Sequence, residues 1–95
     1  MHYLYILHSK TVNTFYVGES HDLNERLLKH NQHIYGGSFT KIASDWETVL
    51  TFECVSKNQA VSLEKFIKKT KSKVFIQKLI NNPEILNDII NKHNY

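Results

Sequence analysis

The residue of this chain best suited to chemistry is a carboxylate, Glu64, which stands in the helical pattern SKNQAVSLEKFIKK. Successive helical residues advance by about 100°, which places Glu64 between Ala60 and Val61, inside the apolar arc of that helix. A partly desolvated carboxylate costs free energy unless it is paired or bound to a metal. Glu64 is therefore predicted either to bind a cation or to form an ordinary i,i+4 ion pair with Lys68.

A second candidate is Arg26, which lies four residues before His30 in a predicted first helix from about Asp22 to Ile34. This spacing puts the two side chains on the same side of the helix. A guanidinium suits a phosphate because its planar fork donates two hydrogen bonds and stays charged. The alternatives are an ordinary surface arginine and, for His30 considered alone, a half-buried histidine without a chemical role.

Other kinds of site find little support in the sequence. There is no HExxH motif, no Cys/His ligand set and no Ser-His-Asp pattern, and Gly36-Gly37 lacks the Lys-Ser/Thr of a phosphate loop. The only cysteine, Cys54, excludes an intramolecular disulfide and is predicted to be a reduced, core-facing thiol. With no secretory leader and no apolar run of roughly 20 residues, we expect a cytoplasmic protein.

Positive charge gathers in the second half of the chain. The net charge is +3, and no acidic residue lies between Lys65 and Pro83. Such a run is either a solvated helix face or a patch that contacts phosphates and gains affinity by releasing counterions. Charge alone does not separate these two interpretations. The lysines of this run are Lys65, Lys68, Lys69, Lys71, Lys73 and Lys78.

The elements that must position these residues begin with two predicted strands, YLYIL at 3–7 and TFYVGE at 14–19. If residues 10–13 form the turn, Tyr5 lies opposite Gly18 and Tyr16 lies opposite Leu7, so that both tyrosines share one face of the sheet. The alternating segment WETVLTFECV predicts a third, half-buried strand. One face of that strand would carry Trp46, Thr48, Leu50, Phe52 and Cys54.

Helical patterns fill the rest of the chain. Ser56 and Gln59 form a capping-box pattern, a break near 70–72 precedes a short helix, and Asn82 is predicted to cap a last helix with Pro83 at its first position. The predicted order is β-β-α-β-α-α-α, an α/β (α+β) fold with a small antiparallel sheet flanked by helices. We expect one domain over residues 1–95, with a core at about 3–78 and an extra C-terminal helix at 83–95.

Taken together, these segments resemble the GIY-YIG nuclease superfamily in its small stand-alone bacterial form, which is related to the nuclease domain of the excision-repair incision subunit. The two half-motifs correspond to Tyr5-Ile6-Leu7 and Tyr16-Val17-Gly18. DLNERLLKHN, GGSFTK and AVSLEKFIK follow in the family's order and spacing. The resemblance runs from about Tyr3 to Lys78. Each motif is weak alone, but the ordered set is specific.

The resemblance implies a three-stranded antiparallel sheet flanked by helices, and it implies roles for individual residues. Glu64 would bind one Mg²⁺ or Mn²⁺, Arg26 would hold the scissile phosphate, and either Tyr5 or Tyr16 would orient or deprotonate the attacking water. Gly18 would let the backbone approach the substrate, whereas Glu19 would add negative charge near the phosphate. Second-rank candidates are His30 for catalysis and, for nucleic-acid binding, Lys41, Lys68, Lys69, Lys71 and Lys73.

We therefore expect a divalent-metal-dependent endonuclease that hydrolyses phosphodiester bonds in duplex or branched DNA, with a role in repair or recombination. Since the sequence shows no fused targeting domain, we expect either low sequence specificity or a protein partner that supplies it. The alternatives are a catalytically weak nucleic-acid-binding module of the same fold and a protein-interaction domain. The last alternative is suggested only by the amphipathic C-terminal helix.

Overall fold

The computed structural model describes residues 2–22, 27, 31 and 42–95. Three strands, β1 (His2–Ser9), β2 (Thr14–Ser20) and β3 (Glu47–Cys54), form one antiparallel sheet in the order β2-β1-β3. The predicted strands and their antiparallel arrangement are confirmed. The first helix expected from Asp22 to Ile34 lies largely outside the described residues.

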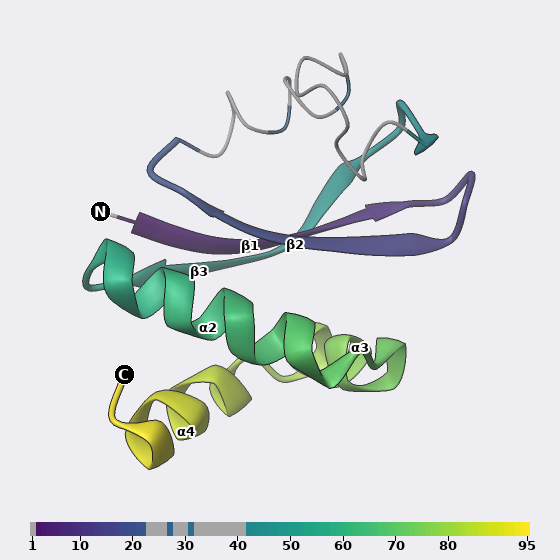
Figure 1. The fold of residues 1–95 in the computed structure, drawn as a ribbon. Coiled ribbons are helices and arrows are strands. Elements are labelled where there is room, and N and C mark those ends of the chain that lie inside the picture. The colour runs from purple at the N-terminus through teal and green to yellow at the C-terminus, as the bar shows by residue number, and fades with distance from the viewer. Residues whose placement is uncertain (1, 23–26, 28–30, 32–41) are drawn as a thin grey trace.

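Three further helices follow the sheet along the chain: α2 (Lys57–Thr70), α3 (Lys73–Asn81) and α4 (Glu84–His93). Figure 1 shows all three on the same face of the sheet, with α2 next to the strands and α4 on the far side of α2. This is the α+β fold that the sequence predicted. Among the described helices, none is long and apolar enough to cross a membrane.

The central strand β1 is buried on both faces, as its continuous apolar run predicted. Leu4, Tyr5, Ile6 and Leu7 are each at most 3% exposed, because β1 lies between the other two strands. Alternate side chains enter two separate cores. Leu4 and Ile6 pack on the side of α2, whereas Tyr5 and Leu7 pack with Trp46 on the opposite face.

The third strand departs from the predicted alternation. Trp46 was expected to share a face with Leu50, and this prediction is wrong. Ile6 pairs with Leu50 while Leu7 pairs with Thr48, so Val49 is an extra residue in the ladder. A bulge of this kind interrupts the two-residue period of a strand. Leu50 therefore enters the core on the side of α2, and Trp46 enters the core on the other side.

The helix boundaries follow local capping interactions. Ser56 Oγ accepts the Gln59 amide at 3.1 Å, as the capping pattern predicted, and Ser72 caps α3 by accepting from Phe75 N at 3.1 Å. The predicted side-chain cap at Asn82 is wrong. Pro83 occupies the capping position of α4 and makes no side-chain cap, while the Asn82 backbone carbonyl accepts from Ile85 N.

The apolar stripe of α4 covers the main core. Leu86 and Ile89 are at most 7% exposed and belong to the cluster that includes Leu63, Leu79 and Cys54. The stripe that suggested a protein-interaction helix is thus used within the chain itself. Cys54 is the buried thiol that the sequence predicted, and burial raises its pKa.

Candidate active site

Two tyrosines and a glycine meet on neighbouring strands. Tyr5 lies opposite Gly18, and Tyr16 lies opposite Leu7, which is the register predicted from the sequence. The two phenol rings share one face of the sheet, with centroids 6.4 Å apart. The predicted pairing of the half-motifs is confirmed.

Gly18 is required by the position of the Tyr5 ring. A Cβ added at Gly18 would lie 2.4 Å from the Tyr5 hydroxyl oxygen and 2.5 Å from its Cζ, well inside ordinary contact distance. The ring therefore crosses directly over the glycine backbone, where no side chain fits. Tyr5 is only 3% exposed and is held in this place, whereas Tyr16 is half-buried at the sheet edge.

The carboxylate of Glu64 reaches the same region through Lys68. Lys68 Nζ lies 3.0 Å from Glu64 Oε1 and 5.3 Å from the centroid of the Tyr16 ring. The side chain of Glu64 is 22% exposed, so the carboxylate is partly screened from water. The ordinary i,i+4 pair considered from the sequence is present. Its ammonium also lies over Tyr16, which sequence reasoning did not foresee.

This contact forms because β2 is an edge strand. The core residues of α2 pack beneath the sheet, while the long stem of Lys68 carries its ammonium to the exposed edge at Tyr16. A groove of about 550 Å³ runs between this edge and the start of α3. The residues that line it are Thr14, Phe15, Tyr16, Val17, Ile67, Lys68, Lys71, Ser72, Lys73 and Ile76.

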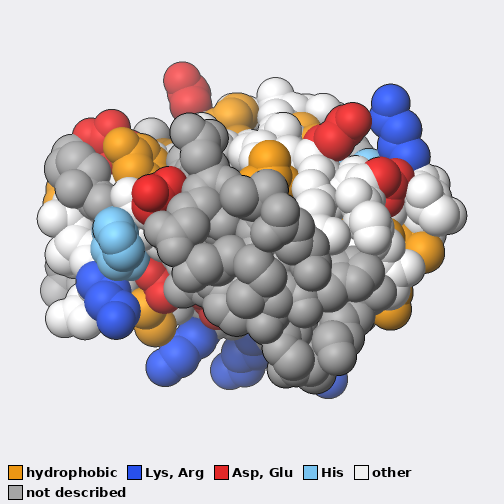
Figure 2. Space-filling view, turned by 90° about the horizontal axis from the view of Figure 1, so that it is seen from above, with side chains coloured by type: hydrophobic (Ala, Val, Ile, Leu, Met, Phe, Trp, Pro, Cys, Tyr) orange, Lys and Arg blue, Asp and Glu red, His pale blue; other side chains and the backbone are white. Residues whose placement is uncertain are grey.

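The basic run of the sequence is divided by the fold. Lys68, Lys71 and Lys73 line the groove beside β2, whereas Lys65 and Lys69 line a different hollow between α2 and the C-terminal residues. Lys69 therefore does not share the groove of the other three, and its predicted contact with nucleic acid stays a prediction. Figure 2, which views the sheet from the face opposite α2, shows basic side chains projecting along the lower edge of the molecule.

Glu19 does not face the tyrosines. It pairs with Leu4 in the ladder, so its side chain leaves the sheet on the face opposite to Tyr5. There it contacts the imidazole of His2, and both side chains are largely buried. The expectation that Glu19 would add negative charge near the phosphate is wrong, because the two-residue period of β2 turns it away.

Two sets of side-chain hydrogen bonds that the sequence analysis missed, made by Asp45 and by Asn31, hold the tyrosine face in place. Asp45 accepts hydrogen bonds from Ser9 Oγ at 2.5 Å and from the amide and hydroxyl of Thr11, at 3.1 and 3.0 Å. The Ser9 hydrogen bond is the main cause that lowers the pKa of Asp45. Asn31 holds the backbone of Trp46 through two hydrogen bonds of 2.7 and 3.1 Å. The only signal in the sequence was the place of Asp45 next to Trp46, and Asn31, fifteen residues before Trp46, had none.

Arg26, His30 and Lys41 lie outside the described residues, so the structure does not test their predicted places. Within the part it describes, no three His, Cys, Asp or Glu side chains form a cluster that could hold a metal ion. The described site thus offers the partly buried carboxylate of Glu64, the ammonium of Lys68 and the phenol of Tyr16 beside a basic groove. Such a set can neutralise a phosphate and orient a water molecule.

Comparison with known proteins gives one match. Residues 1–79 match the GIY-YIG catalytic domain, which leaves α4 outside the matched segment. No curated protein and no solved structure matches the chain. The expected relation to the excision-repair incision subunit is not tested by this match and stays a prediction. Because the match covers most of its length, the chain belongs to the GIY-YIG catalytic domain family, a family of nucleases whose substrates are nucleic acids.

Proposed function

We propose that this domain is a divalent-metal-dependent endonuclease that hydrolyses phosphodiester bonds in DNA. One observation carries the proposal beyond family membership. The partly buried Glu64 carboxylate already holds a cation, the Lys68 ammonium, directly beside Tyr16 at a lysine-lined groove. A carboxylate, a phenol and a basic path for the backbone of a nucleic acid are the groups that phosphodiester hydrolysis needs.

The residues present fit one Mg²⁺ or Mn²⁺ ion. Mg²⁺ keeps several water ligands and is commonly held by one or two carboxylates together with substrate phosphates. Glu64 supplies one such carboxylate, and its Oε1 is accessible to a positive charge, since the Lys68 ammonium lies 3.0 Å from it. When bound, the ion would polarise the phosphate and stabilise the leaving oxygen.

The difference in burial supports separate roles for the two tyrosines. Tyr16 is half-buried at the edge of the sheet and lies next to the Lys68 ammonium, so water and substrate reach its side. Tyr5 is buried against Gly18 and is suited to hold the neighbouring backbone in place. We therefore assign the orientation of the attacking water to Tyr16.

The basic groove supplies a path for the phosphate backbone. Lys68 and Lys71 flank it, and Lys73 donates to the carbonyl of Asn13 at 2.5 Å, which ties α3 to the β1–β2 turn. From the sequence, Arg26 would hold the scissile phosphate, with His30 and Lys41 in supporting places. Action on branched DNA in repair or recombination, a cytoplasmic location and a partner that supplies specificity belong to the same proposal.

The test is a nicking assay with supercoiled plasmid in the presence of Mg²⁺ or Mn²⁺, repeated with a chelator. We expect nicking that requires the metal and is lost in Glu64→Gln, Arg26→Ala and Tyr16→Phe. Tyr5→Phe should retain more activity than Tyr16→Phe, because its ring serves packing. Glu84→Gln, an exposed carboxylate at the start of α4, is the matched control and should cut normally.

The same assay separates the alternative of a catalytically weak binding module. Salt-sensitive binding to DNA without nicking, under every metal condition, would refute the nuclease and support the module. Nicking that persists at full rate in Glu64→Gln would refute the assigned metal ligand. Salt dependence is informative because each lysine that contacts a phosphate contributes a released counterion.

A further inference from the structure

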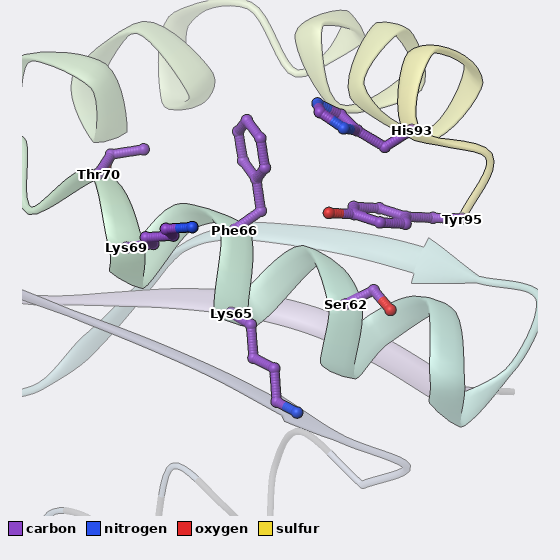
Figure 3. A pocket seen from close by; sticks show the side chains of 7 residues that line it. All are labelled: Ser62, Lys65, Phe66, Lys69, Thr70, His93 and Tyr95. Carbon is purple, nitrogen blue, oxygen red and sulfur yellow. The ribbon is translucent and has the colours of Figure 1, made fainter.

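A second hollow lies away from the candidate active site, between α2 and the C-terminal residues. It has a volume of about 590 Å³ and is lined by Ser62, Lys65, Phe66, Lys69, Thr70, His93 and Tyr95. Figure 3 shows aromatic rings from α2 and from the end of α4 around one hollow, with lysine side chains along α2. None of the residues of this lining is acidic, and the proposed nuclease uses none of them.

The aromatic side of this hollow is a ready stacking surface. The rings of His93 and Tyr95 stack with centroids 5.4 Å apart and planes 21° from parallel, and the Phe66 ring lies 5.0 Å from His93. Tyr95 is 38% exposed, so an aromatic face remains open to solvent. Flat aromatic surfaces of this kind hold unpaired nucleobases by stacking.

The position of Tyr95 is fixed by its backbone. Its amide donates to the Ile90 carbonyl at 3.1 Å, and its carbonyl accepts from Gln59 Nε2 at 3.3 Å. Gln59 itself is buried and also accepts from Val55 N at 3.1 Å, which anchors the contact at the start of α2. The stacking surface therefore exists before any ligand binds, and little conformational entropy is lost on binding.

The charge around the hollow selects an anionic occupant. Lys65 and Lys69 are exposed, and neither is ion-paired with a carboxylate in the described part of the chain. In Figure 3 the ammonium of Lys69 lies beside Phe66, while Lys65 leaves α2 on the side away from the rings. Both lysines belong to α2, so the positive charge lies on the α2 side of the aromatic surface, within reach of the phosphates of a strand that has a base stacked there.

We propose that this hollow binds single-stranded nucleic acid, with a base stacked on Tyr95 and His93 and the flanking phosphates held by Lys65 and Lys69. The proposal rests on the proposed function in taking nucleic acid as the ligand, but the hollow is separate from Glu64 and Tyr16. It deepens that function by naming the substrate class. A second, single-strand contact suits a nuclease for branched or flapped DNA.

The experiment measures fluorescence anisotropy of a short labelled oligothymidylate with the full chain in chelator, so that no cleavage occurs. Tyr95→Ala and Lys69→Gln are each expected to weaken binding by about tenfold. Tyr95→Phe keeps the ring and should restore affinity, which distinguishes stacking from a change in the fold. Lys78→Gln, an exposed lysine of α3 outside this hollow, is the charge-matched control and should bind normally.

The outcomes separate this proposal from the nuclease proposal. Glu64→Gln should lose nicking and keep oligothymidylate binding, because the hollow does not include Glu64. Equal affinity of Tyr95→Ala and the unaltered chain would overturn the hollow as a binding site and leave the nuclease intact. A lack of any binding to the oligothymidylate would also overturn it. A thermal melt by circular dichroism confirms that each variant is folded.

Discussion

Replacing Gly18 by alanine tests the geometry of the tyrosine face most directly. The new Cβ would lie 2.4 Å from the Tyr5 hydroxyl oxygen and 2.5 Å from Cζ, whereas ordinary contact begins at 3.4 Å. The ring must therefore move by about 1 Å or the strands must separate, and overpacking of this kind costs about 1–3 kcal/mol. Alanine in a strand otherwise gains about 0.5–1 kcal/mol over glycine. The overlap exceeds this gain, so the variant should be less stable.

Urea denaturation followed by circular dichroism measures the change in the free energy of unfolding. Substitutions of Tyr5, the other residue of the overlap, provide the controls. In a Tyr5→Phe background the Cζ overlap remains, so Gly18→Ala should still destabilise. In a Tyr5→Val background the ring is gone, and the same substitution should be neutral or stabilising. The resulting double-mutant cycle gives the coupling between the two positions.

Activity gives an independent readout of the same perturbation. A displacement of about 1 Å next to a reacting group can lower the rate by about a hundredfold. Gly18→Ala should therefore reduce plasmid nicking more than its loss of stability explains, with the assay run well below the unfolding transition. The reasoning would be refuted if Gly18→Ala stabilised the protein equally in the Tyr5 and Tyr5→Val backgrounds. The two positions would then not be coupled, and the ring would not lie over the glycine.

Three further predictions address metal binding, pH and the core. Lys68→Ala removes the ammonium that competes with a metal ion for Glu64, so it should tighten Mn²⁺ binding several-fold. Electron paramagnetic resonance of free Mn²⁺ measures this affinity, and weaker binding would contradict the competition between the two cations. The pKa of Asp45 is lowered mainly by Ser9, so its contribution to stability is present at neutral pH and is lost as the pH falls through the lowered value. Asp45→Asn should therefore reduce the fall in melting temperature at acid pH, and an unchanged fall would contradict this prediction. Leu63→Ala, at a fully buried position between α2 and the sheet, should lower the free energy of unfolding by about 2–5 kcal/mol, as measured by urea denaturation. A loss within about 1 kcal/mol would contradict this prediction, because the core would then have closed around the cavity.

The sequence by itself determined the features that depend on local pattern. The run around Tyr5 predicted a strand buried on both faces, and the four-residue turn set the register that brings Tyr5 opposite Gly18. These inferences succeed because hairpin pairing and two-residue alternation involve residues close together in the chain. Ser56 and Gln59 likewise predicted the start of α2 through a contact only three residues apart.

Only the tertiary structure decided the features that depend on contacts between distant segments. The bulge at Val49 shifted Trp46 to the tyrosine face, since pairing with β1 outweighs the alternation of one strand alone. The contact of Lys68 with Tyr16 exists because β2 is an edge strand with α2 packed beside it. Helical spacing could pair Lys68 with Glu64, but it contains no information on which strand lies within reach of a long side chain. That arrangement follows from the packing of the whole chain.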